Sequence, residues 1–265
     1  QGYGQWLSTD SNGNAAAADT NLGGVLLGGD VSLANTVFGL AAGYSSASTS
    51  TDLASADTET WRIAAYGGAR FDAIKLRAGA SYGWSSIDTS RFVALTGEAP
   101  KASYDGTAGN LFAEAGYTVA LGGVAFEPFA GIGWTSVNLG SFAETNAPVA
   151  GLASQGTSFD TAYTTLGLRL ATTFAAGNGI AVTPHASAGW RHAFGDVVPE
   201  AAVVFVNTGT VFGVEGLPIA EDSLVASLGI DLAFATGVTL TLAYDGMAGD
   251  GASYNAGKAA LAVKF

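Results

Sequence analysis

The sequence predicts an all-β protein, an integral outer-membrane barrel of twelve antiparallel strands in up-and-down order. Apolar and polar residues alternate with a period of two along most of the 265 residues, which indicates strands that are apolar on one face only. The connections between these segments alternate between short and long, as in bacterial outer-membrane barrels. Charged residues make up only 12% of the chain, and those inside the segments lie opposite the aromatic and aliphatic residues.

Twelve segments show the alternation. In segment 124–137, for example, Phe126 and Ile132 share one face while Glu127 lies on the other. No apolar run approaches the roughly 20 residues that a membrane-spanning helix needs. In chain order, the predicted strands are 1–8, 20–33, 37–47, 57–71, 74–89, 106–121, 124–137, 158–174, 180–193, 222–235, 238–247 and 254–265.

The connections follow a regular order along the chain. Short ones are predicted at 34–36, 72–73, 122–123, 175–179 and 236–237, long ones at 9–19, 48–56, 90–105, 138–157 and 194–221, and a modest one at 248–253. Within the longest connection, two valine-rich runs, 203–206 and 211–214, flank the turn sequence NTGT. This arrangement predicts a hairpin that projects beyond the membrane and lies at the mouth or rim of the barrel.

Charged residues inside the strands predict the lining of the barrel. At the bilayer midplane, an Arg or Lys that faces lipid costs about 2–4 kcal/mol. Five cations share the polar faces of their strands and are expected to face the lumen, namely Arg62, Arg77, Arg169, Arg191 and Lys258. Five carboxylates on polar faces are expected to pair with them, namely Asp30, Glu114, Glu127, Asp231 and Asp245. A soluble β-sandwich, the alternative fold, does not require polar faces so uniformly small, charged and glycine-rich.

Aromatic residues gather near the ends of the apolar faces, as expected for rings at the two membrane interfaces. Trp6, Trp61, Tyr82, Trp84, Trp134, Trp190 and Tyr244 lie towards the long connections, and Phe71, Phe174, Phe234 and Phe265 lie towards the short ones. The strands are therefore expected to contact outer-membrane lipid. Acidic residues in the long connections indicate a hydrated rim or, alternatively, carboxylates that divalent cations bridge to lipopolysaccharide.

The size of the barrel limits its function. Twelve strands leave a lumen of order 10 Å, about the width of one α-helix, which suits a passing or plugging peptide segment. A porin-like channel for small solutes remains an alternative. The net charge of −12 argues against nucleic acid as a partner.

No catalytic, metal or cofactor site is expected. The stretch Gly79–Gly83 matches the GxSxG pattern of hydrolases, but Ser81 lies inside an alternating strand rather than at a strained strand-to-helix turn. His185 and His192 are too few to define a metal site, and cysteine is absent. We therefore expect the chain not to be an enzyme.

Several stretches together resemble the translocator β-domain of autotransporters, the type Va secretion family. They are GGVLLGGD at 23–30, AYGGARF at 65–71, LRAGASYGW at 76–84, FEPFAGIGW at 126–134, LGLRL at 166–170, AGWRHAFGDVVP at 188–199 and GLPIAEDSLVASLGIDL at 216–232. The resemblance implies one barrel domain over 1–265 that carries an N-terminal passenger across the bacterial outer membrane. It further implies a linker helix that occupies the lumen and contacts its charged residues, with both linker and passenger absent from this chain.

The carboxyl-terminal stretch resembles the assembly signal of the same family. Lys258, Val263 and Phe265 match that signal, Ala260 stands where glycine is usual, and Leu261 continues the lipid-facing alternation. The resemblance implies that periplasmic chaperones and the barrel assembly machinery recognise this stretch. It also implies a periplasmic carboxyl terminus, loops at the cell surface, and a monomer.

Overall fold

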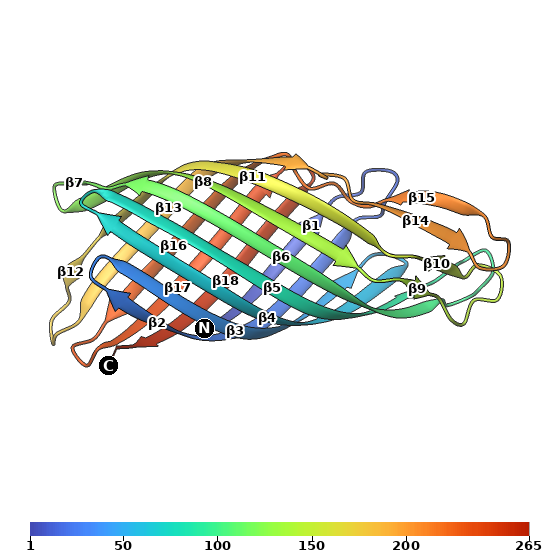
Figure 1. Ribbon diagram of the computed structural model, residues 1–265, viewed down its shortest axis with the longest axis horizontal. Helices are drawn as coiled ribbons and strands as arrows, with labels where there is room; N and C mark the ends of the chain where they lie inside the picture. The colour runs from blue at the N-terminus through green and yellow to red at the C-terminus, as the bar shows by residue number, and fades with distance from the viewer. Residues whose placement is uncertain (265) are drawn as a thin grey trace.

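The computed structural model describes residues 1–264, and every regular element in that part of the chain is a strand (Figure 1). Over the same residues, no helix is long and apolar enough to cross a membrane. The strands are β1 (Gly2–Thr9), β2 (Ala18–Leu33), β3 (Thr36–Ser50), β4 (Ala54–Phe71), β5 (Ile74–Arg91), β6 (Lys101–Tyr117), β7 (Val119–Leu121), β8 (Val124–Leu139), β9 (Phe142–Ala143), β10 (Leu152–Ser154), β11 (Thr157–Thr172), β12 (Phe174–Ala175), β13 (Ala181–Gly195), β14 (Glu200–Phe205), β15 (Val211–Glu215), β16 (Asp222–Ala233), β17 (Val238–Gly249) and β18 (Ala252–Val263).

The long strands form one closed barrel. Each pairs antiparallel with its neighbours in the chain, and β18 pairs with β1, so that Gly2 lies opposite Ala259 and Thr9 opposite Ala252. The short β7 and β12 continue β6 and β11 beyond Thr118 and Thr173 in the same register. The wall therefore contains the predicted twelve strands.

The two ends of the barrel differ, and we call them the turn end and the loop end. The turn end carries the connections 34–35, 72–73, 122–123, 176–180 and 234–237; the loop end carries 10–17, 51–53, 92–100, 140–156, 196–221 and 250–251. At the turn end, Gly122 and Gly123 have φ angles of 58° and 88°. Two central residues with positive φ form the turn type that matches the twist of paired strands, so glycine suits this connection.

The predicted alternation of short and long connections is only partly correct. Strands β3 and β4 extend further than the sequence pattern indicated, which reduces the predicted connection 48–56 to residues 51–53. Likewise, the predicted connection 248–253 is a turn at 250–251. Polar, small residues such as Ser48 and Thr49 belong to the strands because ladder hydrogen bonds, not apolar alternation, define how far the pairing runs.

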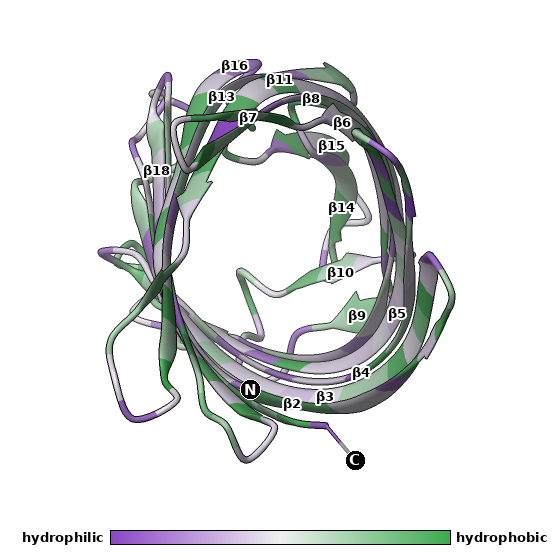
Figure 2. Ribbon diagram, turned by 90° about the vertical axis from the view of Figure 1, so that its left-hand side faces the viewer, coloured by the Kyte–Doolittle hydropathy of each residue, from purple (hydrophilic) through white to green (hydrophobic). Residues whose placement is uncertain are grey.

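The loop end carries a second, four-stranded sheet in the order β15–β14–β10–β9. The hairpin predicted in the longest connection is present as β14 and β15, with Val203 opposite Phe212. Strand β10 then joins this hairpin to β9, with Leu152 opposite Phe205. The sheet extends beyond the barrel in Figure 1, and it lies within the outline of the wall when viewed along the barrel in Figure 2.

Apolar side chains cover the outside of the barrel. The predicted aromatic belts lie on this face, with Trp61 65% exposed near the loop end and Phe71 54% exposed near the turn end. Buried apolar residues, by contrast, are small: Ala102, Ala150, Val182, Ala193, Val203, Ala220 and Ala256. A face this apolar is not stable against water but matches lipid, so the packing is the inverse of that in a soluble sandwich.

Aromatic rings lie inside the barrel as well, which the sequence analysis did not predict. A Cβ atom on Gly133 would come within 2.1 Å of the Tyr163 ring, and one on Gly167 within 2.5 Å of the Phe129 ring. Because these glycines lie beside the aromatic residues on neighbouring strands, each ring covers the bare backbone of a glycine. The glycine-rich lumen is therefore partly filled by aromatic side chains.

Candidate functional site

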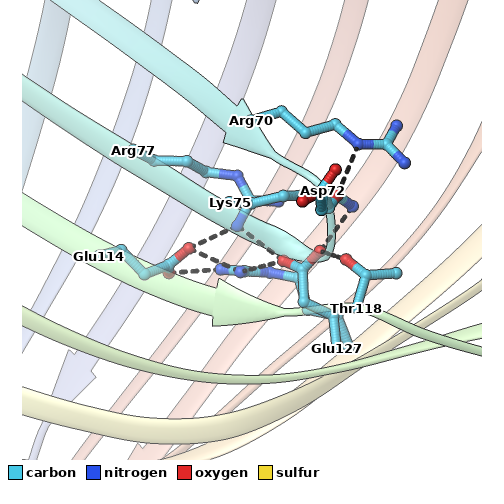
Figure 3. A network of polar contacts seen from close by, with 8 residues as sticks. Arg70, Asp72, Lys75, Arg77, Glu114, Thr118 and Glu127 are labelled. Atoms are coloured by element: carbon cyan, nitrogen blue, oxygen red, sulfur yellow. Dashed lines mark hydrogen bonds and ion pairs between the residues drawn. The ribbon is translucent and has the colours of Figure 1, made fainter. Parts of the chain in front are cut away.

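The predicted lumen residues lie on the inner faces of their strands, and five charged side chains form one network on the wall made by β5, β6, β8 and β11. Glu127 on β8 lies at its centre and is only 4% exposed. Glu127 Oε2 accepts from Lys75 Nζ at 2.6 Å, and its Oε1 lies 2.8 Å from Arg77 Nη1. Figure 3 shows these side chains converging across adjacent strands.

The second carboxylate of the network is Glu114 on β6. From β5, Arg77 Nη1 donates a hydrogen bond to Glu114 Oε1 at a distance of 2.7 Å. Arg169 on β11 donates with both terminal nitrogens, Nη1 to Oε1 at 2.6 Å and Nη2 to Oε2 at 2.5 Å. Two parallel N–H donors fit a carboxylate closely, so Arg169 holds Glu114 in one orientation.

Strand register explains why the network forms at this place. Arg77 lies directly opposite Glu114, and Glu127 directly opposite Arg169. A Cβ atom on Gly116 would come within 2.9 Å of the Glu127 side chain. Glycine beside the carboxylate therefore leaves the space that Glu127 occupies.

Hydrogen bonds and a ring complete the network. Thr118 Oγ1 donates to Glu127 Oε2 at 3.0 Å, and Arg169 Cζ lies 3.9 Å from the centroid of the Phe129 ring. Three cations share two carboxylates, so the network has an excess of one positive charge. Lys75 was not among the predicted lumen residues, although its position two residues before Arg77 places it on the same strand face.

Two predicted residues form a separate ion pair near the seam, where β18 meets β1. Lys258 Nζ lies 2.5 Å from Asp245 Oδ2, across the pairing of β17 with β18. A cavity of about 520 Å³ lies between this pair and the wall network, and Glu114, Arg169, Arg191, Asp245 and Lys258 line it. The structure thus brings charged residues from both sides of the barrel around one internal space.

The expected pairing of every lumen cation with a carboxylate is wrong for two arginines. Arg191 Nε donates to Thr165 Oγ1 at 3.3 Å, and its Cζ lies 4.5 Å from the Tyr163 ring centroid. Arg62 Nε is buried and has no hydrogen-bond partner among residues 1–264. Within the same residues, neither arginine has a carboxylate within 4 Å, because no acidic residue lies opposite it on a neighbouring strand.

The two remaining predicted carboxylates pair with neutral hydroxyl groups. Tyr66 donates to Asp30 Oδ2 at 3.1 Å, and Thr241 donates to Asp231 Oδ1 at 2.6 Å. His185 Nε2 lies 3.9 Å from Asp231 Oδ2. Asp30 and Asp231 therefore belong to neither the wall network nor the seam pair.

The residues of the expected assembly signal lie along the last strand. Leu261 and Val263 are exposed on the outer face, as predicted, while Lys258 points inward to Asp245. Ala260 lies opposite Thr241 on β17. The prediction for Phe265 lies outside the described residues.

Known structures share this architecture. The translocator domain of the autotransporter NalP from Neisseria meningitidis is 19% identical with a TM-score of 0.82, covering 100% of this chain and 86% of that one. The β-domain of the Bordetella autotransporter BrkA is 19% identical with a TM-score of 0.70, covering 97% of each chain. These similarities support the fold.

Two sequence relatives, both described as an extracellular serine protease of Serratia marcescens, are 31% identical over 266 residues. The match covers 99% of this chain but only 25% of each relative, so this chain spans about a quarter of their length. The family model for the autotransporter beta-domain matches residues 1–245. Together with the closed barrel and its charged lumen, this match shows that the chain belongs to the autotransporter β-domain family, the outer-membrane translocators of passenger domains.

Proposed function

We propose that the lumen holds the segment that links this translocator to its passenger, and that the passenger leaves at the loop end. The observation that carries this proposal is the cavity of about 520 Å³ between the wall network and the seam pair. Its lining combines five charged side chains with apolar ones such as Phe129 and Met247, and this mixture suits a polypeptide, which carries polar and apolar groups together, better than a lipid or an apolar solute.

The two arginines without carboxylate partners support the same assignment. Arg191 lines the cavity, and the Arg62 side chain has a buried Nε without an acceptor. A buried donor without a partner costs about 1–3 kcal/mol. Acidic or carbonyl groups on a segment in the lumen would satisfy Arg191, which lines the cavity, and would offset the charge of Arg62. Glu114 and Glu127, by contrast, are already paired and serve to hold the wall in shape.

The orientation follows from the two ends of the barrel. We propose that the loop end, with its acidic connections and four-stranded sheet, lies at the cell surface near lipopolysaccharide, and that the carboxyl terminus lies in the periplasm. Exposed Leu261 and Val263 on β18 support recognition of this strand by periplasmic chaperones and the barrel assembly machinery. We propose a monomer, since the barrel closes on itself and leaves β1 and β18 paired.

The chain is proposed to catalyse no reaction itself. The description of the Serratia relatives as proteases applies to whole proteins, of which this chain matches a quarter. Within β5, Ser81 accepts a hydrogen bond from Asn110 at 3.4 Å. A Ser81→Ala variant should therefore export its passenger at the rate of the unmodified protein.

Surface display tests the proposal. A passenger and a linker segment fused upstream of Gln1 should become accessible to protease on intact cells. Insertion of the barrel is measured separately by the shift in its electrophoretic mobility on heating. An inserted barrel whose passenger stays protected from protease would contradict the assignment.

Conductance in planar bilayers distinguishes translocation from the porin-like alternative, which the family assignment does not favour. With the linker segment present, the proposed function predicts a lumen that is closed to ions most of the time. A large, stable conductance with the segment in place would instead support a channel for small solutes.

A further inference from the structure

A second pocket lies inside the barrel at its turn end, beside the connection 34–35. We call it the turn-end pocket. It has a volume of about 550 Å³ and shares only Phe112 with the cavity between the wall network and the seam pair. The polar and aromatic side chains that line it from the inner faces of β2, β4, β5 and β6 are Ser32, Tyr66, Arg70, Lys75, Arg77 and Phe112.

Three cations line this pocket, and no carboxylate among residues 1–264 does. Arg70 lies directly opposite Lys75 in the pairing of β4 with β5. The neighbour of Arg70 in the chain, Phe71, is exposed on the outer face, so Arg70 and Lys75 both lie on the inner face. Like charges directly opposite each other on one face of a sheet repel, and this repulsion favours a counter-ion in the pocket.

Arg70 has terminal nitrogens that no other group uses. Its one side-chain hydrogen bond within the described residues runs from Nε to the backbone O of Asp72, at 3.2 Å. No carboxylate in this part of the chain lies within 4 Å of an Arg70 nitrogen. Figure 3 shows its guanidinium apart from the carboxylates of Glu114 and Glu127. Both Nη groups can therefore donate to a ligand.

The acidic residues around the pocket are engaged elsewhere. Glu127 holds Lys75 and Arg77 from β8. Asp30 accepts a hydrogen bond from Tyr66 and forms no ion pair within residues 1–264. The side of the pocket that faces the lumen is therefore positively charged.

The charge balance indicates an anion with two charges. The wall network has three cations and two carboxylates, and Arg70 adds a further cation beside them. A carboxylate would neutralise only one of the two excess charges. A phosphate monoester carries about −1.5 to −2 charges at pH 7 and has three strong acceptor oxygens, and arginine binds phosphate through two parallel N–H groups. The chemistry of the pocket thus fits a phosphate better than a carboxylate.

Two aromatic rings give the pocket an apolar part. A Cβ atom on Gly39 would come within 2.2 Å of the Tyr66 ring, and one on Gly79 within 2.5 Å of the Phe112 ring. Each ring therefore lies on the bare backbone of a glycine, which fixes its position. A volume of about 550 Å³ is that of a site for a small organic molecule, so there is room beside the rings for more than an inorganic ion.

We propose that the turn-end pocket binds a small phosphate monoester, with the phosphate at Arg70 and the organic group against Tyr66 and Phe112. Lys75 contributes charge from the opposite strand. Membrane lipids carry phosphate groups as well, but this pocket lies inside the barrel, whereas acyl chains contact the outer face. A free ester is therefore the source of the phosphate, and its binding does not depend on export of a passenger.

Phenyl phosphate is the probe, and the chain is refolded in dodecyl maltoside micelles, which contain no phosphate. Isothermal titration calorimetry should show that phenyl phosphate binds several-fold more tightly than inorganic phosphate, because only the ester contacts the two rings. Phenol, which lacks the phosphate, should not bind. Arg70→Gln should weaken the binding of phenyl phosphate about tenfold, the effect of losing one charge-assisted hydrogen bond.

Lys264→Gln is the matched control. It removes one positive charge at the same end of the barrel, from an exposed residue that does not line the pocket, and the affinity for phenyl phosphate should stay the same. Refolding of each variant is checked by the shift in electrophoretic mobility on heating. If Arg70→Gln does not refold, Arg70→Lys replaces it, because lysine keeps the charge but cannot donate two parallel hydrogen bonds, and a several-fold loss of affinity is expected.

Three results would overturn the proposal. The first is no binding of phenyl phosphate to the unmodified chain. The second is equal affinity in the Arg70 variant and in Lys264→Gln, which would show that only the overall charge matters. The third is displacement of phenyl phosphate by phosphatidic acid added to the micelles, which would assign the phosphate chemistry to a lipid headgroup.

Discussion

Two regions of the barrel differ in the interactions that hold neighbouring strands together. One is the wall formed by β5, β6, β8 and β11, and the other is the seam formed by β18, β1 and β2. Strand β5 has 18 residues, and its charged side chains join a network that spans four strands. Strand β1 has 8 residues, and Gly2 and Gly4 lie opposite Ala259 and Gly257. The wall is held by the ladder and by side chains, while the seam depends chiefly on its backbone ladder.

This difference implies an uneven distribution of stability around the barrel. Side-chain contacts across β5, β6, β8 and β11 must all break before these strands separate. At the seam, the ion pair between Asp245 and Lys258 joins β17 to β18 rather than β18 to β1. We therefore expect substitutions in the wall to have larger effects than equivalent ones beside the seam.

The largest effect is expected for Glu127→Gln. The substitution leaves Lys75, Arg77 and Arg169 with one carboxylate instead of two. Removing one partner of a buried ion pair costs about 3–5 kcal/mol, and we expect about 3 kcal/mol because the three cations are about a third exposed. Urea unfolding of the barrel in lipid vesicles measures this change.

Arg62→Gln provides the control for Glu127→Gln, since it removes a lumen charge that has no carboxylate partner. The free energy of unfolding should not fall, and it should rise by up to about 1–3 kcal/mol, because the substitution removes a buried donor that has no acceptor. Equal losses in the two variants would show that the wall network is not what stabilises β5, β6, β8 and β11.

A smaller effect is expected for Gly133→Ala, which tests the aromatic packing of the same wall. The new methyl group would come within 2.1 Å of the Tyr163 ring and displace it from beneath Arg191. Overpacking of this kind costs about 1–3 kcal/mol. Gly131→Ala on the same strand, whose Cβ atom has no neighbour closer than 3.5 Å, should leave the unfolding temperature nearly unchanged.

Beside the seam, Asp245→Asn should cost only about 1 kcal/mol. Lys258 is 37% exposed and Asp245 26% exposed, so water screens this pair and its contribution lies near that of a surface ion pair. The same urea measurement in vesicles applies. A loss as large as that of Glu127→Gln would mean that the seam, not the wall, controls unfolding.

The smallest effect concerns the rim, where Glu98 joins the 92–100 and 140–156 connections. Burial alone would raise the pKa of Glu98, but the N–H groups of Ala150 and Val149, which donate to its carboxylate at 2.8 and 2.9 Å, hold that pKa below its ordinary value of 4.5. A lowered folded-state pKa means that the stabilisation is complete above pH 4.5 and is lost as the pH falls through the folded value.

Hydrogen exchange at residues 147–151 should therefore accelerate below pH 4.5 once the intrinsic pH dependence of exchange is subtracted. Glu98→Gln, which cannot titrate, should remove this acceleration, while exchange in β5 and β8 stays constant in both proteins. An unchanged acceleration in the variant would assign the effect to another group.

Several features of the barrel could be predicted because they depend on local pattern. The alternation of residues such as Phe126 and Glu127 identifies a strand with an apolar and a polar face, and it needs no knowledge of the neighbouring strands. The cost of a charge in lipid then assigns the polar face to the lumen. Twelve strands, and a hairpin built on the two valine-rich runs 203–206 and 211–214, follow from the sequence pattern and are present in the structure.

Other features depend on which residues lie opposite one another, and a single strand does not contain that information. Lys75 joins Glu127 although the two belong to strands separated by β6. Arg62 lies between Gly43 and Gly83 on the two neighbouring strands, so no acidic residue lies opposite it. The alternation along its own strand is nevertheless like that around Arg77, which does lie opposite a glutamate. The pairing of β9 and β10 with the hairpin could not be predicted either, because strands of only two or three residues are too short to show an alternating pattern.

The sequence by itself determined that this chain forms a lipid-facing barrel with a charged interior, because alternation along a strand sets which face each side chain occupies. Only the tertiary structure decided how those charges are shared. Strand register placed Arg77 and Arg169 against Glu114 and Glu127, and it left Arg62 and Arg191 without carboxylates. The physical reason is that ion pairs form over a few ångströms, and those distances are set between strands rather than along them.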